Sequence, residues 1–169
     1  MPQFVCPFEL KSITERGQFE GFAAVYSVID ELEDVVEPGA FERTLREGRE
    51  LSLYWEHKEV IGTVELRDSP SALLVKGKLS LGVQRADEAL ILLRDRAVKG
   101  LSIGFKTIRS DFVGAVRHLK ELRLWEISLT GLPANQQSVV TAVKNLDHAR
   151  IQFALKDFRD DILRALGRK

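Results

Sequence analysis

Short runs of alternating apolar and polar residues constrain the fold of this 169-residue chain most strongly. Alternation with a period of two places every second side chain on the same face of a β-strand. Such runs lie at 19–28, 51–57, 60–66, 72–79, 101–109, 116–129 and 138–143. The turn sequence Asp68-Ser69-Pro70-Ser71 separates the third and fourth runs, which predicts a β-hairpin.

Two segments between these runs have helical spacing instead. The segment 40–47 predicts a short helix with Phe41 and Leu45 directed inward, and the segment 84–98 predicts a longer one that ends at Gly100. Many short strands with two helices between them predict an α+β domain. We expect a mostly antiparallel β-barrel core, or a strongly curved sheet, with helices around it.

The composition changes after this part of the chain. Residues 145–169 are rich in charges and carry one apolar stripe, which is typical of an amphipathic helix. We therefore expect two parts, a main domain at 1–144 and a helical tail at 145–169. The tail would dock on the domain, on another protein or on a second copy of the chain, which would make a homo-oligomer.

Charge and composition exclude several classes of function. Twenty-five basic and 25 acidic residues balance, so nothing favours binding to nucleic acid or to an anionic membrane. No apolar run approaches the roughly 18 residues that span a bilayer, and the first residues do not resemble a secretory signal. A single cysteine, Cys6, excludes an internal disulfide and fits a reducing cytoplasm, although it could also act as a nucleophile.

Cofactor sites are not predicted either. No glycine-rich loop between a strand and a helix matches a dinucleotide or nucleoside triphosphate motif. Neither His118 nor His148 has Cys, His or Asp partners at the spacing of a zinc site. We therefore expect neither a cofactor nor a metal.

The segment Lys99-Gly100-Leu101-Ser102-Ile103-Gly104-Phe105 contains the first candidate catalytic residue, Ser102. Strand alternation places Ser102 and Gly104 on one face, opposite the apolar residues. The two glycines would leave room around the hydroxyl, as a nucleophile requires. A serine in an ordinary turn between a helix and a strand has the same sequence, so both interpretations stand.

His57 and Glu126 are the other two candidates. His57 ends the strand 51–57, where it could exchange protons or simply close the strand. Glu126 lies in the apolar run Leu124-Trp125-Glu126-Ile127-Ser128-Leu129, on the face of Leu122, Leu124 and Ser128, and an ionised carboxylate there needs a partner. That partner is either the histidine or one of three arginines, Arg94, Arg96 or Arg109.

Together the three candidates could form a catalytic triad in the chain order His57, Ser102, Glu126. Triads are recognised by roles and geometry, and they occur in different orders on unrelated folds. The backbone amides of Ile103 and Gly104 are candidates for an oxyanion hole. His118 is the rival of Glu126 as the third member, whereas His148 in the tail is expected to be solvated.

Six short segments, in this order, resemble the prohead (capsid maturation) serine proteases of tailed bacteriophages. They are FEGFAAVY at 19–26, DVVEPGAF at 34–41, LYWEH at 53–57, GLSIGF at 100–105, LWEISL at 124–129 and PAN at 133–135. The resemblance implies a fold similar to that of herpesvirus assemblins, a β-barrel with surrounding helices. It also implies an enzyme that acts in the host bacterial cytoplasm, inside the immature capsid.

The substrate implied by this resemblance is a scaffold protein or the N-terminal scaffolding region of the major capsid protein, and commonly the protease itself. The family's histidine matches His57, its serine matches Ser102 and its acidic third member matches Glu126. Assemblins use a second histidine instead, which keeps His118 as an alternative. The other function compatible with the resemblance is an inactive protein of the same fold that assists capsid assembly or binds scaffold.

Overall fold

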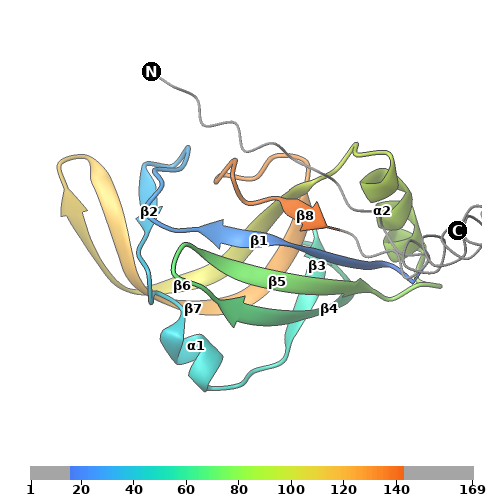
Figure 1. Cartoon of the computed structure of the whole chain (residues 1–169), viewed down its shortest axis with the longest axis horizontal. Coiled ribbons are helices and arrows are strands. Elements are labelled where there is room, and N and C mark those ends of the chain that lie inside the picture. Colours follow the sequence, from blue (N-terminus) through green and yellow to red (C-terminus); the bar gives the residue numbers. More distant parts are fainter. Residues whose placement is uncertain (1–15, 143–169) are drawn as a thin grey trace, which may run out of the picture.

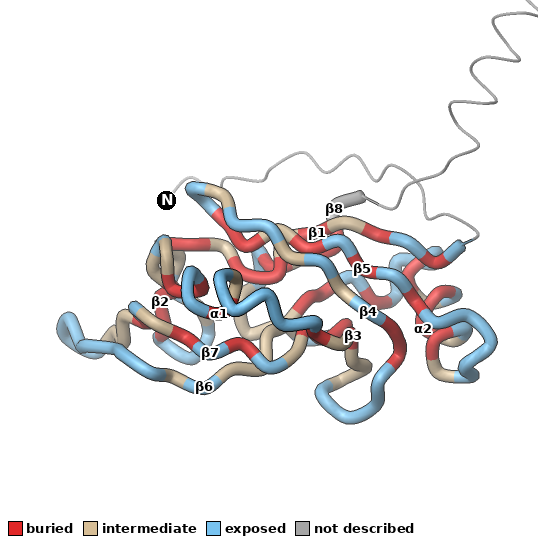
Figure 2. Tube along the Cα trace, turned by 90° about the horizontal axis from the view of Figure 1, so that it is seen from below, coloured by how far each residue is buried: buried red, intermediate tan, exposed pale blue. Residues whose placement is uncertain are grey.

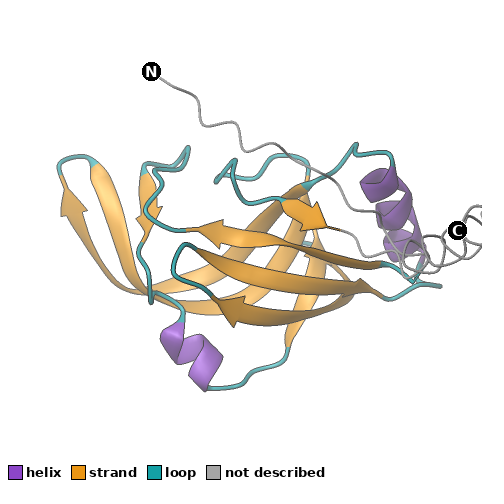
Figure 3. Ribbon diagram, viewed as in Figure 1, coloured by secondary structure: helices purple, strands orange, loops and turns teal. Residues whose placement is uncertain are grey.

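The structure is a computed structural model that describes residues 16–142. A curled sheet of eight strands forms the body of this part of the chain, and two helices lie at its periphery (Figures 1 and 3). The elements are β1 (Gln18–Val25), β2 (Asp34–Val36), α1 (Glu42–Arg46), β3 (Leu51–Trp55), β4 (Glu59–Asp68), β5 (Ala72–Leu79), α2 (Gln84–Arg94), β6 (Gly100–Val113), β7 (Val116–Thr130) and β8 (Val140–Ala142).

The sheet is mixed and curls into a half-barrel. Most of its strand pairs are antiparallel and it is strongly curved, as expected, but two pairs are parallel and the strands do not close into a barrel. The strand order is β2-β7-β3-β4-β5-β1-β8, with β6 paired to the other edge of β7. The hairpins β3-β4, β4-β5 and β6-β7 are antiparallel, but both β2 and β3 run parallel to β7. Side-chain alternation is the same in parallel and antiparallel strands, so the sequence pattern does not encode strand direction.

Helix α1 takes the place of a strand beside the middle of β7. The N–H of Leu122 donates to the carbonyl of Ala40 at 2.8 Å. The Thr44 hydroxyl donates to the carbonyl of Leu122 and accepts from the N–H of Leu124, both at 3.1 Å. These bonds satisfy buried backbone groups of β7 between the stretch paired with β2 and the stretch paired with β3.

The hydrophobic core lines the inside of the curled sheet. Figure 2 shows buried positions recurring along the strands between exposed ones. Burying one large apolar side chain stabilises the fold by roughly 1.5–3 kcal/mol. The largest side chains that are fully buried are Phe19, Phe41, Leu53, Ile61, Leu73, Leu79, Leu101, Leu119, Leu122, Leu124, Ile127 and Leu129.

Most predicted elements are confirmed, with local differences at their ends. The hairpin turn at 68–71 lies between β4 and β5 as expected, and α1 follows buried Phe41. Helix α2 ends at Arg94, because the chain leaves the helix through Arg96 at φ 58°, and Gly100 begins β6 rather than ending the helix. The predicted helical tail at 145–169 and its boundary lie outside the described residues.

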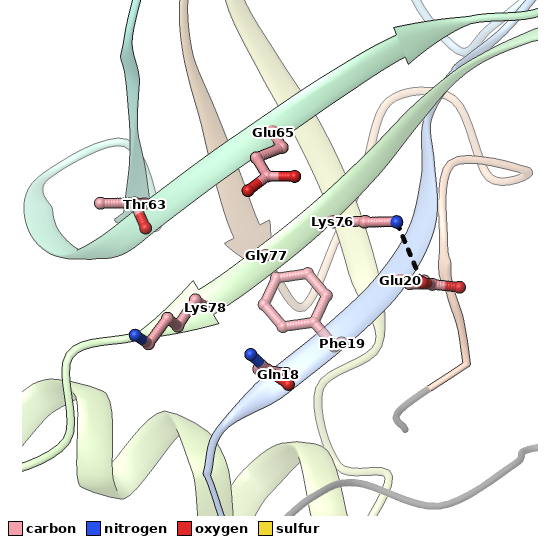
Figure 4. Close-up of a pocket in the computed structure, with 8 residues that line it drawn as sticks. All are labelled: Gln18, Phe19, Glu20, Thr63, Glu65, Lys76, Gly77 and Lys78. Carbon is pink, nitrogen blue, oxygen red and sulfur yellow. Dashed lines mark ion pairs between the residues drawn. The ribbon is translucent and has the colours of Figure 1, made fainter. Parts of the chain in front are cut away.

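A cavity of about 270 Å³ lies on the sheet where β1, β4 and β5 are adjacent (Figure 4). Polar side chains line it, among them Thr63, Glu65 and Lys78. Its floor contains Gly77, where a Cβ atom would lie only 2.1 Å from Cζ of Phe19, so the aromatic ring occupies the space that a side chain would need. The cavity contains none of the predicted site residues.

Candidate active site

Ser102 lies near the start of β6, where that strand has neighbours on both sides. Its Cα is paired with that of Ser128 on β7, and the N–H of Leu101 donates to the carbonyl of Ser138 at 2.8 Å on the opposite edge. Backbone hydrogen bonds on both edges therefore hold the segment that carries the serine.

The two glycines around Ser102 do not leave the open space that was expected. A Cβ on Gly100 would lie 2.6 Å from the carbonyl oxygen of Thr130, and one on Gly104 would lie 2.2 Å from Oε1 of Glu126. The protein itself occupies both spaces. At Gly104 the occupant is the carboxylate of a candidate catalytic residue, so this glycine makes room for Glu126 rather than for a substrate.

His57 lies in a turn beyond β3 and does not belong to the strand, in contrast to the prediction. Strand β3 ends at Trp55, and both Glu56 (φ 48°) and His57 (φ 58°) have left-handed backbone conformations. Residues other than glycine enter this region at a cost of roughly 1–2 kcal/mol each. The turn thus needs stabilising contacts to persist.

The side chain of Glu56 supplies two of these contacts. Its carboxylate accepts hydrogen bonds from the hydroxyl of Thr130 at 3.0 Å and from the N–H of Gly131 at 2.9 Å. The backbone N–H of Glu56 also donates to the carbonyl of Leu129 at 3.0 Å. The end of β7 therefore holds the turn that presents His57.

The structure brings Ser102, His57 and Glu126 into one hydrogen-bonded row. Nε2 of His57 lies 3.0 Å from Oγ of Ser102, and Nδ1 lies 2.5 Å from Oε1 of Glu126. When the carboxylate is ionised it only accepts hydrogen bonds, and this arrangement suits the tautomer with the proton on Nδ1. In that tautomer Nε2 accepts a hydrogen bond from the serine. The His57 side chain is 45% exposed and that of Glu126 only 13%, which leaves the histidine accessible from solvent.

A β-bulge directs Glu126 toward this row. Gly104 of β6 is paired with Glu126, whereas the next residue, Phe105, is paired with Leu124, so Trp125 is the extra residue of β7. Leu124 is fully buried and Trp125 is 60% exposed. The bulge moves Glu126 off the face of Leu124, on which the simple alternation had placed it. The carboxylate bonds to the histidine and not to any of the arginines considered above.

The two oxyanion-hole candidates differ in direction. Successive N–H groups of a strand point to opposite edges, and the N–H of Leu101 points away from β7 toward Ser138. The N–H of Ile103 therefore lies on that same edge, where β6 has no named strand partner among the described residues. The N–H of Gly104 faces β7 instead.

His118, the alternative to Glu126 as the third member of the triad, is not part of the hydrogen-bonded row. Nδ1 of His118 is 2.6 Å from Oε1 of Glu37, and its Cα is paired with those of Val35 and Asp111. His118 and Glu126 are eight positions apart along β7, so the strand keeps His118 well away from the hydrogen-bonded row. Cys6 and His148 lie outside the described residues.

Several side chains within residues 16–142 have pKa values that their surroundings shift. Burial, together with a hydrogen bond to Asp68, raises the pKa of Tyr26. The hydrogen bond to Asp34 raises the pKa of Arg117, and the hydrogen bond to Lys120 lowers that of Asp111. No group of three or more His, Cys, Asp or Glu side chains within these residues could hold a metal ion, and no helix among them is long and apolar enough to cross a membrane.

Two residues of the site were missed from the sequence. Ser128 bonds to both His57 and Glu126, and Glu56 holds the histidine turn. The signal for Ser128 was its position two residues after Glu126, which places both on one face of a strand. Glu56 had no such signal, because its contacts depend on the end of β7.

Comparison with known proteins gives the chain its family. The family described as caudovirus prohead serine protease matches residues 7–151. The prohead protease of Enterobacteria phage HK97 is 30% identical over 141 residues, which are 79% of this chain and 63% of that protein. The capsid polyprotein of Pseudomonas phage PAJU2 is 29% identical over 151 residues, or 82% of this chain and 22% of that protein.

The chain thus spans less than two thirds of either relative. The residues compared with HK97 nevertheless cover most of this chain, and the family match includes the whole hydrogen-bonded row from His57 to Glu126. The chain belongs to the caudovirus prohead serine protease family.

Proposed function

We propose that this chain is a serine endopeptidase that cleaves scaffold protein, or the scaffolding region of the capsid protein, as a phage prohead matures. The observation that carries the proposal is the row Ser102–His57–Glu126, with heavy-atom distances of 3.0 and 2.5 Å, in a chain of this family. The name of the PAJU2 relative, a capsid polyprotein, supports a capsid protein as substrate. The site of action would be the immature capsid inside the host bacterium.

The reaction follows from the proton positions in the row. His57 Nε2 removes the hydroxyl proton of Ser102 as Oγ attacks the scissile carbonyl, and Glu126 stabilises the imidazolium that forms. The histidine then protonates the leaving amine, and the peptide bond is replaced by an acyl-enzyme ester. Water, deprotonated by His57, hydrolyses that ester and regenerates the serine.

The developing oxyanion needs hydrogen-bond donors. The N–H of Ile103 is the better of the two predicted donors, because it lies on the open edge of β6 beside Ser102. The N–H of Gly104 points toward β7 and is a poorer candidate. One such donor is typically worth about 10²–10³ in rate.

Replacement of Ser102 with alanine tests the proposal. We expect S102A to lose cleavage of the cognate capsid or scaffold protein by at least about 10⁴-fold, since it removes the atom that forms the ester. The matched control is S110A, an exposed serine on the same strand, which should cleave normally. Undiminished cleavage by S102A would refute the assignment.

A fluorophosphonate distinguishes this proposal from an inactive assembly protein of the same fold. An activated serine is modified covalently, so mass spectrometry should find the phosphonyl group on Ser102 in the wild type and no modification in S102A. An inactive protein that only binds scaffold would remain unmodified. Cleavage of the chain by itself, and any association between copies, can be followed in the same mass spectra.

A further inference from the structure

Ser128 is a fully buried hydroxyl directly behind the row of catalytic candidates. It lies on β7, where its Cα is paired with Ser102 of β6 on one side and with Tyr54 of β3 on the other. Its exposed fraction is 0%. A buried hydroxyl at the junction of three strands needs hydrogen-bond partners, and the identity of those partners shows what it does.

Both partners of Ser128 are members of the proposed triad. Its Oγ accepts a hydrogen bond from the backbone N–H of His57 at 3.0 Å, and its O–H donates to Oε2 of Glu126 at 2.8 Å. Oε1 of the same carboxylate is the oxygen that contacts the histidine ring. One hydroxyl therefore connects the backbone of the base to the carboxylate that orients the base.

The two hydrogen bonds of Ser128 hold two groups whose positions need stabilising contacts. The His57 backbone is in the left-handed region, and the carboxylate of Glu126 lies in the space left by Gly104. Without Ser128, the N–H of His57 would lose the acceptor that it has among residues 16–142, and Oε2 of Glu126 would lose its hydroxyl donor. Both groups could then rotate, and the 2.5 Å contact between ring and carboxylate would no longer be held.

We infer that Ser128 is a positioning residue of the active site, which fixes His57 and Glu126 relative to each other. The inference rests on the proposed serine protease function. It assigns Ser128 no contact with substrate and no proton transfer during the reaction. Its effect is on the fraction of molecules in which the row is aligned.

The test compares S128A and S128C with the control S138A. Ser138 is also a buried serine beside β6, and it is 2% exposed. Its hydroxyl has no hydrogen-bond partner among the residues that the structure describes, and its contact with Leu101 uses only the backbone. Cysteine at 128 retains a side chain of similar shape, but sulfur is a weak donor and acceptor. S128C therefore tests the hydrogen bonds even if S128A does not fold.

Two measurements report whether Ser102, His57 and Glu126 remain aligned. The first is the second-order rate of fluorophosphonate modification at Ser102, which we expect to fall by about 10²-fold in S128A and S128C and to stay within about twofold in S138A. The second is the ¹H NMR resonance of the His57 Nδ1 proton, which should shift upfield or broaden in the Ser128 variants only.

The outcomes separate this inference from the proposed function. If wild-type Ser102 is not modified, the proposed function is wrong. If the wild type is modified and S128C reacts at the same rate with an unchanged Nδ1 resonance, the function stands and the role of Ser128 is wrong. A slower rate in S138A as well would also overturn the inference, because loss of any buried hydroxyl would then have the same effect.

Discussion

Substitution of Gly104 with alanine is the sharpest test of how the site is built. The added Cβ would lie 2.2 Å from Oε1 of Glu126, whereas ordinary contacts begin near 3.4 Å, so the oxygen has to retreat by about 1.2 Å. Because the same oxygen lies 2.5 Å from Nδ1 of His57, the retreat breaks the contact that orients the ring. We expect G104A to fold and to lose most of its activity.

The size of the loss can be bounded from two general cases. A misplacement of about 1 Å in a catalytic constellation costs on the order of 10²-fold in rate. Complete loss of the orienting carboxylate in a serine protease costs about 10⁴-fold. The rate of G104A should therefore lie about 10²–10⁴-fold below that of the wild type, while alanine itself is no less compatible with a strand than glycine.

A double-mutant cycle gives the decisive measurement. The rate of Ser102 modification by a fluorophosphonate is compared for the wild type, G104A, E126A and the double variant. If Gly104 acts only by making room for Glu126, adding G104A to E126A should lower the modification rate by less than about twofold. The effects of the two substitutions would then clearly not be additive. The role assigned to Gly104 is wrong if G104A reacts like the wild type, or if the alanine slows the reaction by the same factor with and without Glu126.

Two further predictions concern the scaffold around the site. T44V removes the hydroxyl that bonds Leu122 and Leu124, so it should destabilise the protein by about 2–3 kcal/mol in urea unfolding, and a change below about 0.5 kcal/mol would contradict this. Y26F removes the 2.5 Å hydrogen bond to Asp68 and should cost about 1–2 kcal/mol at neutral pH. Because the pKa of Tyr26 is raised in the folded state, the stabilisation is present below the ordinary tyrosine pKa of about 10 and is lost as pH rises above it. Between pH 8 and 11, the free energy of unfolding should therefore fall more steeply with pH for the wild type than for Y26F. The same pH dependence in both proteins would contradict the assignment.

Much of the fold could be predicted because period-two alternation is a local property. The hairpin of β4 and β5 followed from two alternating runs and the turn sequence at 68–71, and α1 and α2 followed from helical spacing. The runs at 101–109 and 116–129 predicted strands, and these strands are β6 and β7 of a long antiparallel hairpin. These elements depend on neighbouring residues, which the sequence shows directly.

The errors occur where one residue interrupts the alternation. In β1 the register shifts between Phe22 and Ala24, so Ala23 and Ala24 are both buried. Phe22, which simple alternation places on the same face as Ala24, is only half-buried. In β7 the extra residue Trp125 has the same effect and turns Glu126 to the other face. A bulge depends on the partner strand, and therefore a single strand's sequence does not reveal it.

By itself, the sequence determined which residue types could do chemistry and which family they resemble. These residues are a serine with a glycine two positions away on each side, a histidine at the end of an apolar run and a glutamate within another apolar run. Only the tertiary structure decided that His57 lies within hydrogen-bond distance of both Ser102 and Glu126. It also decided that Gly104 leaves room for the carboxylate of Glu126 and that Ser128 donates a hydrogen bond to it. The physical reason is that strand pairing is non-local. Parallel pairing of β3 with β7 and antiparallel pairing of β6 with β7 bring together residues far apart in the chain, such as His57 and Glu126, which are 69 positions apart. No local pattern specifies which strands become neighbours.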